Sequence, residues 1–149
     1  MREIEFRGYD PDTERWYYGS YVRLERTTRY PISPDPEGDE KKFQAEQVDH
    51  YIFFTESSDW GLPTRKLRAT VDPASVGQYT GIRDKSKHKI YEGDILRTDM
   101  GDFVVYWRNE CSGWYIKKPD GHIEFLAPWL GNSHHDQEVI GNTYKKKTP

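Results

Sequence analysis

Residues 78–97 read QYTGIRDKSKHKIYEGDILR, and this stretch decides the architecture of the chain. Gly81 ends one element, because glycine adopts backbone conformations that other residues avoid. A polar run at 84–87 has the composition of an exposed turn, and residues 90–91 restore apolar character. A second tight turn at 92–94 leads into the next strand. The stretch therefore predicts a connector between two β units.

The second turn contains an acidic pair, Glu92 and Asp94, which has two interpretations. Two neighbouring carboxylates are compatible with general acid–base chemistry. An acidic-Gly-acidic turn also commonly caps the start of a strand, because Asp bonds nearby backbone groups. We favour this structural interpretation.

The same segment resembles the YopX family of phage and prophage proteins. Similar runs occur in the same order elsewhere in the chain: MREIEFRGYD at 1–10, WYYG at 16–19, DPASVG at 72–77 and VIGNTY at 139–144. The resemblance implies a phage-encoded accessory protein with a β-rich, partly SH3-like barrel fold. It carries over no catalytic or binding residue.

Composition independently favours strands. The chain has 149 residues, of which 34% are hydrophobic and 15% aromatic, while the best helix formers among the apolar residues are scarce. This length suits one domain or two small joined units. We expect an N-terminal antiparallel β unit at 1–77, with a mobile insertion near 31–48, and a connector and SH3-like β-barrel at 78–149.

Individual strands follow from alternation and from turn residues. We expect them at 3–7, 15–24, 51–54, 66–71, 94–98, 103–107, 113–117, 122–126 and 138–144. The first two pair as a hairpin around a turn at 10–12. Asp72 is expected to cap a short turn of helix that begins at Pro73. Gly19, inside the second strand, indicates a bulge or a close backbone approach.

Net charge argues weakly against a dedicated nucleic-acid-binding protein, since it is −3. Basic residues nevertheless gather in the middle of the chain, at Lys85, Lys87 and Lys89, and in a tail at 145–147. We interpret them as solvated loop charges. The alternative is a nucleic-acid-binding module that uses this basic middle and tail.

The sequence also bears on the cell compartment. The single Cys111 has no intrachain disulfide partner, which fits a reducing cytoplasm. Charge begins two residues from the N-terminus, so no secretory leader is expected, and no stretch approaches the ~20 apolar residues of a membrane helix. We expect the host cytoplasm and no membrane association.

Catalytic and metal motifs are weak. His134, His135 and His122 form the one cluster resembling a metal site, but they lack ligand spacing, so we expect no metal and no cofactor. A metal-dependent hydrolase remains a second alternative, built on turn carboxylates at Asp84, Glu92, Asp94, Asp99 and Asp102. We expect no enzyme.

Aromatic residues are the remaining candidates for binding. Trp107, Trp114, Tyr106, Tyr115 and Trp129 exceed what one small barrel core accommodates. They are expected either to cover a seam between the two β units, which we favour, or to bind a partner. The candidate binding residues are thus Trp107, Trp114, Tyr115, Trp129, Lys85, Lys87 and Lys89. The leading function is a noncatalytic interaction module with an unknown protein partner of phage or host.

Overall fold

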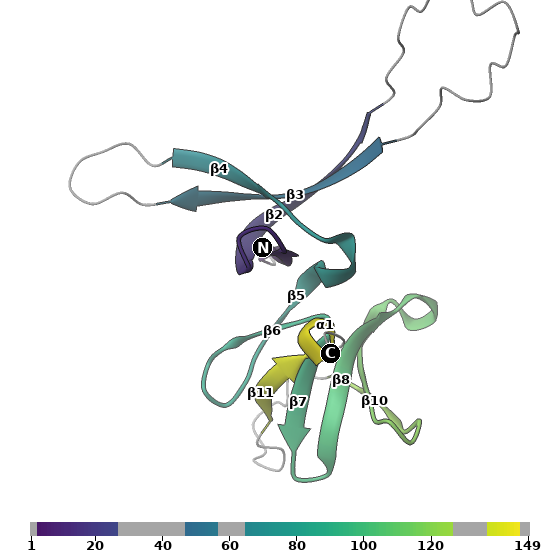
Figure 1. Cartoon of the computed structure of the whole chain (residues 1–149). Coiled ribbons are helices and arrows are strands. Elements are labelled where there is room, and N and C mark those ends of the chain that lie inside the picture. The colour runs from purple at the N-terminus through teal and green to yellow at the C-terminus, as the bar shows by residue number, and fades with distance from the viewer. Residues whose placement is uncertain (1–2, 27–46, 57–64, 127–136, 147–149) are drawn as a thin grey trace, which may run out of the picture.

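The computed structural model of the chain describes residues 3–26, 47–56, 65–126 and 137–146. These residues form two antiparallel β-sheets, one above the other in Figure 1, with little helix. The prediction of a mainly β protein is confirmed. The insertion expected near 31–48 lies outside the described residues, apart from its last two positions, which begin β3.

The first sheet has six strands in the order β4-β3-β2-β1-β5-β6. Their bounds are β1 Phe6–Asp10, β2 Arg15–Arg26, β3 Gln47–Glu56, β4 Arg65–Thr70, β5 Gly77–Arg83 and β6 Lys89–Tyr91. The predicted hairpin of β1 and β2 is confirmed, and Asp10 organises its turn. The Asp10 carboxylate accepts hydrogen bonds from Asp12 N–H at 2.9 Å and from Thr13 Oγ1 at 2.9 Å.

Close approach between β2 and β3 explains the glycine inside β2. A Cβ on Gly19 would lie 2.0 Å from the carbonyl oxygen of Phe53, so only glycine fits there without a backbone shift. Beyond this point the two strands pair continuously from Ser20 with Phe53 to Arg26 with Gln47. In Figure 1 the ribbon of β2, β3 and β4 extends well away from the second sheet.

A short 3-10 turn at Pro73–Ser75 returns the chain to the first sheet. Asp72 caps it as predicted, since its carboxylate accepts a hydrogen bond from Ala74 N–H at 2.8 Å. Strand β5 then pairs with β1, and β6 pairs with β5. The connector at 78–97 therefore supplies two strands to the first sheet before it opens the second.

The second sheet has five strands in the order β10-β9-β8-β7-β11. Their bounds are β7 Asp94–Thr98, β8 Gly101–Arg108, β9 Gly113–Lys117, β10 Ile123–Phe125 and β11 Glu138–Asn142; a 3-10 turn spans Asn109–Cys111 and a final helix α1 spans Thr143–Lys146. Within the described residues β10 and β11 do not pair, so the sheet is not a closed barrel. The SH3-like closure is not confirmed.

The last strand is shorter than the sequence predicts. Residues 143 and 144 were expected to continue it, but β11 ends at Asn142, whose side-chain oxygen accepts a hydrogen bond from Lys145 N–H at 3.0 Å. This contact caps the first turn of α1. It redirects Tyr144 from the second sheet toward the first.

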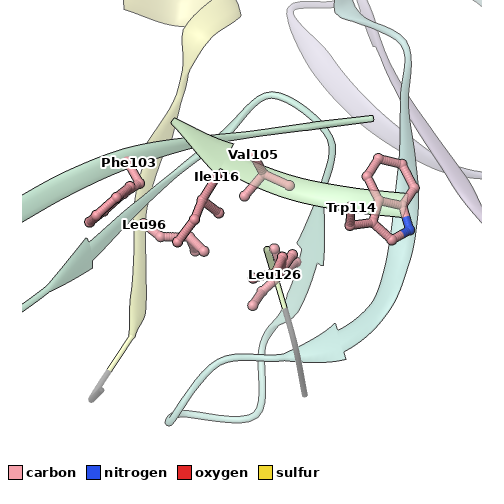
Figure 2. Close-up of a cluster of buried hydrophobic side chains, with 7 residues drawn as sticks. Leu96, Phe103, Val105, Trp114, Ile116 and Leu126 are labelled. Atoms are coloured by element: carbon pink, nitrogen blue, oxygen red, sulfur yellow. The ribbon is translucent and has the colours of Figure 1, made fainter. Parts of the chain in front are cut away.

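Each sheet has its own hydrophobic cluster. In the first, Ile52, Ala69 and Val71 are buried. In the second, Figure 2 shows side chains that converge from neighbouring strands, namely Leu96, Phe103, Val105, Trp114, Ile116 and Leu126; Ile90 of β6 belongs to the same cluster. Because a strand from the first sheet contributes to the second core, the two units share apolar packing.

Candidate functional site

The turn at 92–94 is where the two sheets meet. Gly93 N–H donates to the carbonyl oxygen of Val105 at 2.9 Å, and Thr143 N–H donates to the carbonyl oxygen of Gly93 at 2.9 Å. Arg7 of β1 donates from Nη2 to the carbonyl oxygen of Glu92 at 3.0 Å. The turn therefore has the structural role that we favoured for it.

A buried ion pair lies at this junction. Arg7 Nη1 is 2.5 Å from Asp94 Oδ1, and the two side chains are only 8% and 1% exposed. Asp94 Oδ2 also accepts the Tyr91 N–H at 2.8 Å. Burial raises the pKa of Asp94, although the Arg7 charge and these hydrogen bonds oppose the shift.

Aromatic rings surround the ion pair and form a seam between the sheets. The Arg7 guanidinium lies 4.9 Å from the Trp16 ring centroid and 5.2 Å from that of Tyr91. Tyr144 of α1 packs 5.9 Å from Trp16, edge to face, and its hydroxyl donates to Asp72 at 2.9 Å. An aromatic seam thus exists, built from β1, β2, β6 and α1.

The two tryptophans predicted for a seam or a binding surface lie elsewhere. Trp114 is 7% exposed within the core of the second sheet, and Trp107 packs against that same core. Their ring centroids are 4.9 Å apart in a T-shaped arrangement. Trp129 lies outside the described residues. The rings of Trp107 and Trp114 therefore contribute to the core of the second sheet.

Acidic partners neutralise much of the basic middle. Lys89 Nζ lies 2.6 Å from Glu3 and 2.9 Å from Glu5, and the hydrogen bond to Glu3, followed by that to Glu5, raises the pKa of Lys89. Lys85 Nζ lies 3.1 Å from Glu138. Lys87 is exposed and has no ion pair within the described part of the chain. Two of the three lysines therefore already pair with carboxylates of the same chain.

The turn carboxylates occupy structural positions as well. Asp84 is buried and accepts hydrogen bonds from His88 N–H at 2.8 Å and from Val139 N–H at 3.2 Å, which ties the connector to β11. Burial acts to raise the pKa of Asp84, but the hydrogen bonds from Val139 and His88 outweigh it and the pKa is lowered.

The remaining candidates for hydrolytic or metal chemistry are dispersed. Asp102 pairs with Arg97 at 3.0 Å, and His122 Nε2 lies 2.7 Å from Glu124. Within residues 3–26, 47–56, 65–126 and 137–146, no three His, Cys, Asp or Glu side chains are grouped to hold a metal ion. His134 and His135 lie outside these ranges.

The outer face of the second sheet presents a row of aromatic rings. Tyr106 of β8, Tyr115 of β9 and Phe125 of β10 stand directly opposite one another in register. Ring centroids are 6.3 Å apart for the tyrosine pair and 5.3 Å apart for Tyr115 and Phe125. Phe125 is 54% exposed. We call these three residues the outer aromatic row.

Strand alternation explains this division of the aromatics. Side chains two residues apart share a face, so Trp114 and Ile116 point into the core while Tyr115 between them points outward. The sequence had singled out Tyr115 but not Phe125. The signal was available, because a three-residue loop at Pro119-Asp120-Gly121, with Gly121 at φ of +94°, places Phe125 opposite Tyr115 when β9 and β10 pair.

Two basic residues flank the row on the same face. Arg108 lies two positions beyond Tyr106, and its guanidinium is 5.5 Å from the Tyr115 ring centroid. Lys117 lies two positions beyond Tyr115 on the opposite side of the row and is exposed. The outer aromatic row therefore has a basic side chain on each side.

The helices in the described residues include none that is long and apolar enough to span a membrane.

The fold and this face together define a protein of two joined antiparallel sheets that displays an aromatic surface on one of them. The chain belongs to the YopX family: the family model described as YopX protein matches residues 5–147. The resemblance inferred from the sequence is thus confirmed. A search of the curated proteins finds no match for this chain.

Proposed function

We propose that this protein is a noncatalytic accessory interaction module of phage or prophage origin, which acts in the host cytoplasm. It binds a macromolecular partner of phage or host through the outer aromatic row. The resemblance to the YopX family implied a phage-encoded accessory protein. Membership of that family therefore supports the proposed origin. The one cysteine, exposed and unpaired, is compatible with a reducing compartment.

The observation that carries the proposal is the exposure of Phe125 at one end of the row, next to the half-buried Tyr115 and Tyr106. Phe125 leaves 54% of its surface in solvent, and the adjacent Ile123 leaves 42%. Aromatic side chains contribute most to binding when a partner removes them from water, because they bury a large area and lose little conformational entropy. The row is formed on three paired strands, so it is held rigid before any partner arrives.

The positions of the titratable groups support a noncatalytic role. Asp94 and Asp84 each accept a hydrogen bond from a backbone N–H group. Asp94 does so at the junction of the sheets, and Asp84 does so at β11. Neither carboxylate lies on the face that displays the aromatic row. Among the described residues no three His, Cys, Asp or Glu side chains are grouped to hold the metal that the hydrolase alternative needs, and binding through the row is the function we retain.

Selection from two random libraries tests the proposal. One library displays peptides and the other contains single-stranded oligonucleotides, and each is passed over the immobilised full chain and over a Phe125→Ser variant. Leu24→Ser is the matched control, because Leu24 is 41% exposed on the first sheet. Enrichment that Phe125→Ser abolishes and Leu24→Ser retains supports the proposal. The proposal is overturned if neither library yields ligands that depend on Phe125.

A further inference from the structure

The outer aromatic row has the chemistry of a surface that stacks unpaired bases. Single-strand binding modules combine aromatic rings, on which successive bases stack, with cations that follow the phosphates. Here the rings of Tyr106, Tyr115 and Phe125 cross three neighbouring strands, with centroids 6.3 Å and 5.3 Å apart. Their order is fixed by the strand register.

The cations lie where phosphates would run. Along β8 the face continues from Tyr106 to Arg108, and along β9 it continues from Tyr115 to Lys117 in the opposite direction across the row. A strand of nucleic acid that follows the row from β8 to β10 therefore has a basic side chain on each side. Charge complementarity of this kind distinguishes a polyanion from a neutral or basic peptide.

These two cations are available to a ligand. The Arg108 ion pair with Glu110 is long, at 3.5 Å, and its side chains are 40% and 76% exposed, so it contributes little and exchanges readily for phosphate. Lys117 is exposed and has no ion pair with any described residue. By contrast, Lys85 and Lys89 in the connector already pair with glutamates.

We propose that the outer aromatic row, with Arg108 and Lys117, binds single-stranded nucleic acid. This inference rests on the proposed function, because it names the partner of the same face. Phe125, the most exposed ring, stacks a base, and Tyr115, whose plane is 76° from that of Phe125, borders the same base by its edge. Duplexes bind less well, because their bases are stacked on one another and do not reach the rings.

Single strands of RNA and of DNA both present unpaired bases joined by phosphates. The experiment compares one probe of each kind. Fluorescein-labelled oligo-U and oligo-dT of about 12 nucleotides, within the ~4–16 covered by one small module, are titrated with the full chain. Fluorescence anisotropy reports binding. A duplex of the same length is the third probe.

We expect saturable binding of at least one single strand and weaker binding of the duplex. Phe125→Ser and Tyr115→Ser each weaken binding about 30-fold, the middle of the range for removing one stacking ring. Arg108→Gln and Lys117→Gln each reduce the slope of log affinity against log salt by about 1, measured from about 50 to 200 mM salt. A preference between oligo-U and oligo-dT identifies RNA or DNA.

Two control variants exclude general effects of charge or hydrophobicity. Arg15→Gln removes an exposed arginine at the start of β2, and Leu24→Ser removes an exposed apolar side chain of the same strand. Both should leave affinity for the single strands unchanged, and urea unfolding verifies that every variant is folded.

Three outcomes overturn the inference: no binding of either single strand at low salt, binding that Phe125→Ser leaves intact, or duplex binding as tight as single-strand binding. If the random peptides instead yield a ligand that depends on Phe125 while the oligonucleotides do not bind, the face is an interaction surface for protein. In that case the proposed function stands and the nucleic-acid partner is wrong.

Discussion

Replacing Arg7 with methionine removes the cation that faces the buried Asp94 carboxylate while retaining an unbranched side chain. The Asp94 side chain is 1% exposed, and Arg7 is the cation within 2.5 Å of it. Removing one partner of a buried ion pair typically costs about 3–5 kcal/mol, because the remaining charge is neither solvated nor paired. Against a total stability of about 5–15 kcal/mol, this loss is large.

A second substitution in the same background isolates the charge. Asn at position 94 keeps an acceptor for the Tyr91 N–H but carries no charge. The contacts of Arg7 with Glu92 and with the rings of Trp16 and Tyr91 are absent from both variants and cancel in the comparison. Arg7→Met/Asp94→Asn should therefore be more stable than Arg7→Met by about 1–3 kcal/mol, the cost of an unsatisfied buried group.

The pH dependence gives an independent signature. Burial raises the pKa of Asp94, and in Arg7→Met the opposing cation is gone. A carboxyl that holds its proton more tightly in the folded state stabilises the fold as pH falls, because the folded state takes up the proton first. The deficit of Arg7→Met should shrink as pH falls through this raised pKa, and it should stop changing below the ordinary value of 3.8.

Urea unfolding, followed by tryptophan fluorescence from neutral to acidic pH, measures all three variants. Arg23→Met is the control, since Arg23 and its partner Glu25 are 53% and 60% exposed and such pairs contribute at most about 1 kcal/mol. The reasoning is wrong if Arg7→Met unfolds at the wild-type urea concentration. It is equally wrong if Asp94→Asn gives the Arg7→Met variant no added stability, or if the double variant keeps the pH dependence.

Three further predictions test other parts of the fold. Gly81→Val should cost more than about 1 kcal/mol, because Gly81 has φ of +87°; Gly141→Val, at a glycine without positive φ and with open space around a Cβ, is the control in the same thermal melts. Asp84→Asn should flatten the acid side of the stability curve, because a carboxyl whose pKa is lowered in the fold contributes stability above its unfolded value and loses it as pH falls through the folded value; an unchanged acid limb in urea titrations would contradict this. A fragment of residues 92–149 lacks Arg7 and Ile90, so it should bind a hydrophobic dye and melt without cooperativity; a cooperative melt near that of the full chain would show an autonomous unit.

The sequence predicted those features of the fold that depend on residues close together in the chain. The strands of the second sheet, the first hairpin and the cap at Asp72 each depend on a few neighbouring residues, and each is found, although β11 ends at Asn142 rather than at residue 144. The Arg7–Asp94 pair joins residues 87 positions apart, and no periodicity or spacing in one sequence relates them. The sequence also overestimated the free charge of the connector, because the glutamates that pair with Lys85 and Lys89 come from the two ends of the chain.

The identity of the exposed rings was the harder question. Composition showed that aromatics were in surplus, but a surplus does not say which rings face out. The direction of a ring depends on its position in the alternating pattern of the strand. Trp114 and Tyr115 are adjacent, and their side chains lie on opposite faces of the sheet. Tyr144 packs on Trp16 in the seam, because the chain leaves β11 at Asn142 and the cap there turns Tyr144 toward the first sheet.

The surplus therefore separates into three groups with different energetic roles. Trp107 and Trp114 stabilise the second core, and Trp16 and Tyr144 close the seam, so substitutions in either group should lower stability as large buried rings do. Phe125, 54% exposed, has much less buried contact to lose. Phe125→Ser should lower stability by about 1 kcal/mol, the contribution of its ring contact with Tyr115, and leave the chain folded. Loss of binding in a variant that remains folded would separate the role of the outer aromatic row in recognition from any role in folding.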